Sequence, residues 1–292
     1  MGAIKNKEYI SSSQNLTTRY GGVPVIYVES DEDKYVFGEC WFRERLSTVE
    51  FKPALDKASA SGCSGVIEAV TKELQAGNSA WGIVDRDTTM AHDLWHLVNE
   101  TDDSMFEAAK PFGPSIKVLQ RWEMENYLVD AEALEHYRAA FKKEPARALD
   151  DVHQELLNYC DALVPHAAIN AVLHAKKQTG LSDSYTNRFT TRTEVDADIK
   201  AIKLPHLSPA EQSDYGLQVT KVDTFDDPAA SKEIRVSAML RRVHGKAVLS
   251  RFQYLHKPLP DLDGLLAKRI EEQGRIPDEI ANFVTQVSNS SN

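Results

Sequence analysis

Three acidic side chains, Glu29, Asp85 and Asp87, stand directly after apolar stretches that have the pattern of buried β-strands. Glu29 closes the stretch VPVIYVE, and the two aspartates follow the apolar part of AWGIVDRD. The carboxyl ends of parallel strands meet at one edge of a sheet, where ligands collect. We therefore expect these carboxylates to converge, and such a group repels itself unless a cation is present. The residues predict a site for a hard divalent metal ion.

The predicted chemistry is metal-assisted cleavage of a phosphodiester. Mg²⁺ or Mn²⁺ suits an all-carboxylate set because both ions prefer oxygen ligands and keep several waters. The remaining coordination positions could take a phosphate and an attacking water. Glu125, with its neighbour Glu123, follows a predicted strand at 115–120 and is a further candidate ligand. Lys246, in the turn HGK, is the candidate for holding a phosphate beside the metal.

Other polar residues near this pattern have simpler interpretations. Asp31 and Asp33 fall in the first turn of a predicted helix, where acids are favourable without any ligand, although one of them could bind metal through water. His92 and His96 have the spacing of a zinc-binding helix. The Glu of the HExxH motif and a third ligand are missing, so we do not favour a zinc site.

The elements that must position these residues alternate along the N-terminal half. Apolar stretches at 23–29, 48–53, 80–85 and 115–120 predict strands, and amphipathic stretches between them predict helices, which is typical of a parallel sheet flanked by helices. We therefore predict an α/β fold, with the catalytic domain at 20–130 and a mainly α domain at 131–285. Within the second domain, 179–232 is predicted to be irregular, and helices are predicted around 233–254 and 264–285.

Composition limits the class of protein. With 292 residues the chain can form two modules, and its 42% hydrophobic and 27% charged content is that of an ordinary globular protein. No apolar run approaches the ~20 residues that span a bilayer, and the N-terminus lacks a secretory pattern, so we expect a cytoplasmic protein. Three widely spaced cysteines fit neither a disulfide framework nor a zinc site.

A basic window at 232–257 interrupts an otherwise acidic chain of net charge −10. It holds seven Lys or Arg against Glu233 alone, a net +6. Phosphate contacts are made by such residues, so the window is the predicted nucleic-acid interface, although a solvated helix face or a protein contact would have the same composition. The candidate nucleic-acid-binding residues are Arg235, Arg241, Arg242, Lys246 and Arg251.

These motifs together resemble the Toprim fold, in particular its OLD-like nuclease branch. The Toprim signature is a strand-terminal Glu followed by a strand-terminal Asp-x-Asp, and Glu29, Asp85 and Asp87 match it. The resemblance covers about residues 20–130 and implies a catalytic metal site at these three residues. Two departures are Ser30, where many relatives have Gly, and Arg86, where small residues are common. Neither removes a carboxylate.

A narrower resemblance rests on the segments VESDEDKYVF, VDRD, ENYL and HGKAVL. They are similar to a bacterial family of Toprim proteins that includes the nuclease effector of PARIS-type phage-defence systems. This resemblance implies a toxic effector that cleaves cellular RNA, with tRNA suspected, when an ABC-class ATPase partner senses infection. A homodimer is expected as the active form, since two-fold assembly is the commonest closed symmetry.

Two other functions stay open. A Toprim-like module could have lost catalysis and serve to bind and regulate the ATPase partner, although such a module would be expected to lose one of the three carboxylates. A DNA-directed OLD-like nuclease would keep the same metal site.

Overall fold

The structure, a computed structural model, describes residues 23–56, 58, 62–257 and 262–290. Two compact units make up this part of the chain. Unit 1 contains the described residues of Met1–Ile83, Phe112–Lys117 and Ile276–Asn292, and unit 2 contains those of Val84–Pro111 and Val118–Arg275. The predicted boundary near residue 130 therefore falls inside unit 2. The N-terminal residues that lack a secretory pattern, and residues 20–22 of the predicted first domain, lie outside the described residues.

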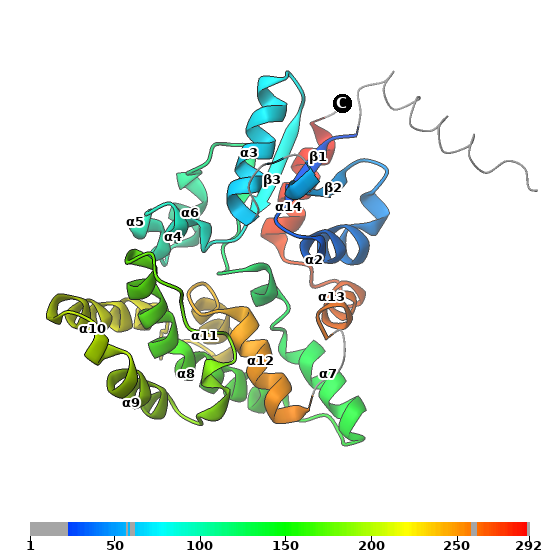
Figure 1. Cartoon of the computed structure of the whole chain (residues 1–292). Coiled ribbons are helices and arrows are strands. Elements are labelled where there is room, and N and C mark those ends of the chain that lie inside the picture. Colours follow the sequence, from blue (N-terminus) through cyan, green and yellow to red (C-terminus); the bar gives the residue numbers. More distant parts are fainter. Residues whose placement is uncertain (1–22, 57, 59–61, 258–261, 291–292) are drawn as a thin grey trace, which may run out of the picture. The chain divides into compact units, whose positions relative to one another are not determined.

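A four-stranded parallel sheet of order β2-β1-β3-β4 is the centre of unit 1 (Figure 1). Its strands are β1 (Val25–Val28), β2 (Glu50–Pro53), β3 (Ala80–Val84) and β4 (Ile116–Val118). Val25 of β1 pairs with Glu50 of β2 and with Ala80 of β3, so these three strands run in register and end at the same edge. The predicted α/β fold with a parallel sheet is confirmed.

The helices of unit 1 follow from local sequence signals. Ser30 begins α2 (Asp31–Lys34): its hydroxyl accepts from the Asp33 backbone, and the Asp33 carboxylate accepts from the Ser30 backbone. Asp33 is thus part of a helix cap, as the simpler interpretation predicted. A π-helical segment η1 (Tyr35–Trp41) continues from α2, and its Phe37 stacks on Phe51 of β2.

Two longer helices complete unit 1. On α3 (Gly62–Gln75), Val66 and Val70 pack so closely on β3 that a Cβ at Gly82 would lie 2.6 Å from Val66 Cγ1, which explains the glycine there. The last helix, α14 (Asp278–Asn289), is joined to the sheet by a buried ion pair of 3.0 Å between Glu279 and Lys117 of β4. Short 3₁₀ turns connect these elements: η2 (Arg43–Arg45) and η3 (Ala54–Asp56).

Unit 2 is helical and is built around α8 (Leu149–Ala175), which contacts the helices α7, α9, α10, α11 and α12 (Figure 1). Seventeen of its 27 residues are buried, which fits a central helix. The helices of this unit are α4 (Thr88–Ala91), α5 (Trp95–Val98), α6 (Asp103–Ala109), η4 (Met124–Tyr127), α7 (Ala131–Lys142), α8, η5 (Tyr185–Arg188), α9 (Arg192–Ile202), η6 (Leu204–His206), α10 (Pro209–Asp223), α11 (Lys232–Met239), α12 (Gly245–His256) and α13 (Leu262–Glu272).

The prediction of irregular structure at 179–232 was wrong. This stretch contains α9 and α10, and each begins with a capping box, formed by Thr191 with Glu194 and by Ser208 with Glu211. The Ser, Thr and Pro content that suggested loops belongs instead to helix starts, where these residues satisfy the first backbone N–H groups. In the described part of the chain, no helix is both long and apolar enough to cross a bilayer.

Candidate functional site

Four carboxylates and one lysine of unit 2 form what we call the acidic centre: Asp85, Asp87, Glu123, Glu125 and Lys246. Asp85 and Asp87 follow β3, the two glutamates flank the start of η4, and Lys246 lies in the first turn of α12. The Lys246 ammonium is 3.3 Å from Glu125 Oε1 and 3.9 Å from Glu123 Oε2. Three segments far apart in the sequence thus contribute charges to one place, and the acids outnumber the lysine.

Backbone donors hold two of these carboxylates in place. The Met124 N–H donates to Asp85 Oδ1 at 2.9 Å, which joins the end of β3 to η4. The Lys246 N–H donates to Glu123 Oε1 at 2.8 Å, which joins α12 to the same turn. Glu123 therefore accepts an otherwise unpaired N–H at the start of α12, where negative charge is favourable. The acids of the centre are fixed by main-chain contacts as well as by Lys246.

Asn126 connects the two turns that carry Glu123 and Lys246. Its Oδ1 accepts from the backbone N–H groups of Glu123 and Gly245, each at 3.0 Å. Its Nδ2 donates to the carbonyls of Leu240 and Val243, each at 2.8 Å. The side chain is 0% exposed, so all four contacts are sheltered from water. Asn126 therefore determines how the lysine-bearing turn meets the acid-bearing turn.

The electrostatics of the centre are those of excess negative charge. Burial and the neighbouring Glu125 raise the pKa of Glu123 to about 8, against the opposing effect of Lys246. Burial raises the pKa of Asp87 to about 6, although Lys246 and His174 of α8 act in the other direction. Burial alone would lower the pKa of Lys246, but Glu123, Glu125 and Asp85 raise it. Lys246 therefore keeps its positive charge, and the carboxylates favour any further cation.

The donor set is suited to a hard divalent ion, because all the candidate ligands are carboxylate oxygens, two of them on side chains only 5–6% exposed. Among the described residues, no group of three or more His, Cys, Asp or Glu side chains is already arranged as a complete set of metal ligands. Of the predicted ligands, Asp85, Asp87 and Glu125 belong to the acidic centre. Glu123, a less favoured candidate in the sequence, belongs to it too.

Glu29 and the two acids after it lie in unit 1. Glu29 follows β1 directly, and its carboxylate lies close to the start of α3, where a Cβ at Gly62 would be 3.5 Å from Glu29 Oε2. Asp31 and Asp33 occupy the first turn of α2. Because β1 and β3 end at the same edge of the sheet, the strand arrangement on which the Glu29 prediction rested is confirmed.

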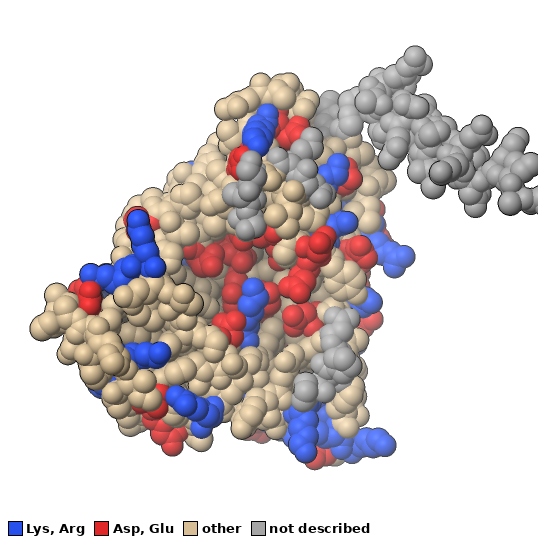
Figure 2. All heavy atoms as spheres, in the orientation of Figure 1, with Lys and Arg blue, Asp and Glu red and all other residues tan. Residues whose placement is uncertain are grey.

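The basic window is largely neutralised by contacts within unit 2. Arg235 forms a two-pronged ion pair with Asp226, and Arg241 pairs with Asp103. Arg242 and Arg251 are buried, and Arg251 donates to the carbonyls of Thr186 and Thr190. On the face drawn in Figure 2, basic side chains stand singly or in small groups beside acidic ones. Nucleic-acid binding by these residues stays a prediction, and Arg242 and Arg251 would have to be uncovered to take part.

The two histidines with zinc-like spacing do not share a helix. His92 ends α4 and His96 lies in α5, and between them Asp93 has a φ of 58° that interrupts the helix. His92 and His96 therefore do not lie on one face of a single helix, as a zinc-binding helix would require.

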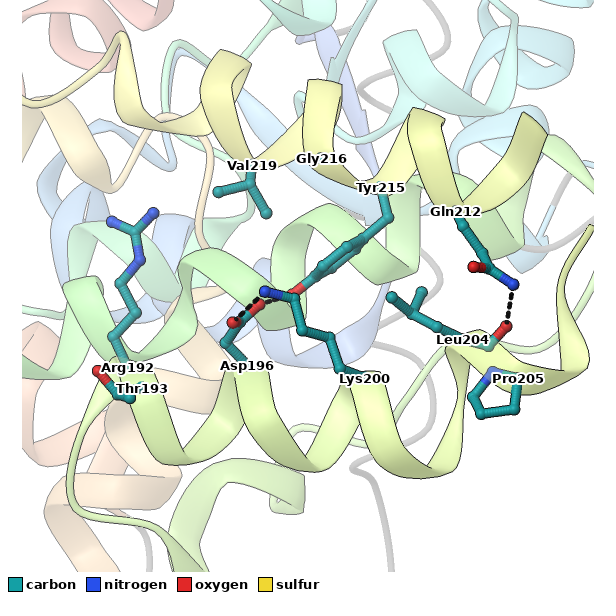
Figure 3. Close-up of a pocket in the computed structure, with 10 residues that line it drawn as sticks. All are labelled: Arg192, Thr193, Asp196, Lys200, Leu204, Pro205, Gln212, Tyr215, Gly216 and Val219. Atoms are coloured by element: carbon teal, nitrogen blue, oxygen red, sulfur yellow. Dashed lines mark hydrogen bonds and ion pairs between the residues drawn. The ribbon is translucent and has the colours of Figure 1, made fainter. Parts of the chain in front are cut away.

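A separate cavity of about 660 Å³ lies between α9 and α10 (Figure 3). Tyr215 projects into it, and its hydroxyl donates to Asp196 at 2.7 Å, while Lys200 pairs with the same carboxylate. Gln212 donates to the Leu204 carbonyl on the opposite wall. No residue of the acidic centre lines this cavity.

Comparison of the chain with models of protein families, with curated proteins and with solved structures found no match.

Proposed function

We propose that this protein is a divalent-metal-dependent phosphodiesterase that cleaves nucleic acid. The observation that carries the proposal is the acidic centre, in which Lys246 pairs with Glu125 and Glu123 and interacts electrostatically with Asp85 and Asp87. Such a group is unfavourable for the stability of a fold, because like charges held together and partly buried repel one another. Residues of this kind are typical of sites that bind Mg²⁺ or Mn²⁺.

Each residue has a definite task in this proposal. Asp85, Asp87 and Glu125 would hold the metal, which supplies charge neutralisation at phosphate and an activated water when it is bound. Lys246 would bind a non-bridging phosphate oxygen, since its ammonium lies among the same acids and its side chain is half-exposed. Glu123 orients the first turn of α12, and with it Lys246, through its contact with the Lys246 N–H.

We also include Glu29 among the proposed metal ligands, because it matches the strand-terminal Glu of the sequence pattern. It ends β1 at the sheet edge where β3 also ends, as the strand-terminal Glu of the Toprim signature does. The Toprim fold itself, and its OLD-like branch, are part of the proposal. The parallel α/β sheet of unit 1 is compatible with them.

The finer function follows from the resemblance alone. We propose a phage-defence effector that cleaves cellular RNA, with tRNA as the suspected substrate, after release by an ABC-class ATPase, and that is active as a homodimer. The net charge of −10 supports regulated action, because it disfavours indiscriminate binding to polyanions.

The first experiment is a cleavage assay with Mg²⁺ or Mn²⁺ on total RNA and on plasmid DNA. Isosteric variants of the proposed ligands should each lose cleavage by about 100-fold or more: Asp85→Asn, Asp87→Asn, Glu125→Gln and Glu29→Gln. Their circular dichroism spectra and thermal unfolding should stay close to those of the wild type. Asp151→Asn, which changes an exposed acid of α8, is the matched control. Full cleavage by the Asp85 and Glu29 variants would exclude the proposed site.

A second experiment tests the regulation. The protein should copurify with an ABC-class ATPase partner when the two are coexpressed, and tRNA should stay intact until the complex is triggered. A chain that is monomeric, binds no ATPase and leaves tRNA untouched in Mn²⁺ would overturn the effector proposal without affecting the metal site.

A further inference from the structure

Three exposed lysines gather where α7 and α12 of unit 2 end. Lys142 is the last residue of α7, Lys143 follows it, and Lys257 follows α12. The Lys142 ammonium lies 3.2 Å from Nδ1 of His256, the last residue of α12, so the two helix ends are in contact. Among the described residues, none of the three lysines takes part in an ion pair.

The acids of this corner of unit 2 are engaged by other cations. Glu144, which follows the two lysines of α7 in the sequence, pairs with Arg138 at 2.7 Å. Glu155 of α8 pairs with His256 at 2.7 Å. The helix α12 itself contains no Asp or Glu. Figure 2 shows basic side chains standing together at the ends of α7 and α12, with acidic ones beside them. The charge of the three lysines is therefore left for a partner.

Two exposed aromatic rings stand beside these lysines. Phe141 is 54% exposed, and with Lys257 it lines a small hollow between α7 and α12. Tyr254 is 63% exposed and precedes Lys257 by three residues, a spacing that places residues on one side of a helix. Rings among lysines are typical of surfaces that bind nucleic-acid strands, because bases stack on the rings and lysines contact phosphates. We call this surface the lysine patch: Phe141, Lys142, Lys143, Tyr254 and Lys257.

One ridge of α12 connects the lysine patch with the acidic centre. Lys246, Ser250 and Tyr254 are spaced four residues apart, so they lie along one row of the helix surface. The helix has 12 residues and is therefore about 18 Å long. One strand of a duplex advances about 3.4 Å per nucleotide, so roughly five nucleotides reach from a phosphate at Lys246 to the far end of α12.

We propose that the lysine patch is a second contact surface for the nucleic acid, and that it holds the strand about five nucleotides from the phosphate bound at Lys246. The inference rests on the proposed function, from which it takes the phosphate at Lys246. It places the main phosphate contacts on exposed lysines rather than on the arginines of the basic window, which are paired or buried. A nucleic acid uses both the charges and the rings, whereas an acidic protein surface would use the charges alone.

The test is fluorescence anisotropy with a labelled single-stranded RNA long enough to reach along α12, in EDTA, so that binding is measured without metal or cleavage. Changing Lys142, Lys143 and Lys257 together to Gln should weaken binding by about tenfold or more. It should also reduce the slope of log K against log salt by about two, since each lost phosphate contact on a single strand accounts for about 0.7.

The matched control changes three other exposed lysines of unit 2 to Gln: Lys110, Lys177 and Lys200. This variant loses the same charge and should keep the wild-type slope. Equal losses in the two triple variants would assign the effect to net charge and would overturn the proposal, as would wild-type affinity in the lysine-patch variant. If that variant binds RNA normally but no longer copurifies with the ATPase, the patch is a protein contact instead.

Single variants separate stacking from charge and binding from folding. Tyr254→Ala should weaken binding by about tenfold with an unchanged salt slope, whereas Tyr254→Phe keeps the ring and should bind like the wild type. Lys143 has a φ of 53°, which favours glycine, so Lys143→Gly should lose affinity while its unfolding temperature holds or rises. Wild-type affinity in Tyr254→Ala would remove the ring from the site. Because none of these measurements involves cleavage, their failure would leave the proposed metal site intact, and cleavage by Asp85→Asn would exclude that site without changing the binding result.

Discussion

Gly245 and Asn126 fit together so closely that no other side chain can replace the glycine without movement. The Gly245 N–H donates to Asn126 Oδ1 at 3.0 Å, and a Cβ built on Gly245 would lie only 2.4 Å from the Asn126 backbone nitrogen. Lys246 is the next residue, and its own N–H is bound to Glu123. The contact between the two turns therefore determines where the lysine of the acidic centre stands.

The first prediction concerns this contact. Gly245→Ala should destabilise the protein by about 2 kcal/mol or more in urea unfolding, because the new methyl group meets backbone rather than a movable side chain. Gly216→Ala in α10 is the matched control: nothing lies within 4 Å of its Cβ position, so this helix glycine should gain about 0.5–1 kcal/mol. Similar effects of the two substitutions would contradict the close fit.

The second prediction concerns Lys246. Lys246→Met keeps the length of the side chain but leaves four acids without their ammonium, so metal-free stability should fall by about 1–3 kcal/mol. Mn²⁺ should then raise the unfolding temperature of the variant more than that of the wild type, although cleavage is reduced. Lys232→Met, which removes an exposed pair with Asp150, is the control and should change stability by less than about 0.5 kcal/mol. If Mn²⁺ raises the unfolding temperature of Lys246→Met no more than that of the wild type, Lys246 and the metal ion do not share the acidic centre.

The third prediction is a pH dependence from Glu135 of α7. Although burial alone would raise it, hydrogen bonds from Arg138 and Arg147 hold the pKa of this carboxyl at about 2, below its ordinary value of 4.5. A depressed folded-state pKa contributes stability above about pH 4.5, which is lost as the pH falls toward 2. At about 1.4 kcal/mol per pKa unit, the contribution is about 3 kcal/mol.

Urea unfolding between pH 7 and pH 3 measures this effect. Glu135→Gln should be destabilised at pH 7 and should lose less stability than wild type on acidification. Glu132 lies on the same helix as Glu135, and its ion pair with Arg275 is half-exposed. Glu132→Gln should therefore follow the wild-type curve. Parallel curves for Glu135→Gln and wild type would show that the buried pair does not carry this part of the acid sensitivity.

The fourth prediction concerns the basic window. Arg241→Gln should weaken nucleic-acid affinity and reduce the slope of log K against log salt by about one, because one phosphate contact is lost. Arg269→Gln in α13, outside the window, should leave the slope unchanged. Filter binding over a range of salt concentrations measures both, and an unchanged slope in Arg241→Gln would indicate that Arg241 serves its pair with Asp103 rather than phosphate.

The strand ends and their acids could be predicted because their signal is local. An apolar β-branched run followed at once by Glu29, or by Asp85 and Asp87, requires only that the strand be buried and its end be polar, and the observed sheet agrees. The contact of Lys246 with Glu123 could not be predicted in the same way. It joins residues 123 positions apart, through turns whose approach depends on Asn126 and Gly245.

Two other predictions differ from the structure for physical reasons. The polar composition of 179–232 led to a prediction of irregular structure, although Thr191 and Ser208 use their hydroxyls to cap the starts of helices. The basic residues of 232–257 were predicted to be exposed because they are charged. Arg242 and Arg251 are instead buried, Arg242 against the Trp122 ring and Arg251 against the Tyr159 ring and the Thr186 carbonyl. A count of residue types contains neither the capping geometry nor the burial.

Unit 1 is built from three separate stretches of the chain, and this has a consequence for biosynthesis. The helix α14 belongs to unit 1 and pairs through Glu279 with Lys117 of β4, yet it follows all of unit 2 in the sequence. On the ribosome, every residue of unit 2 is translated before the segment that completes unit 1. Nascent chains halted before Ile276 should therefore contain a protease-resistant unit 2 and a sheet that is still open to cleavage.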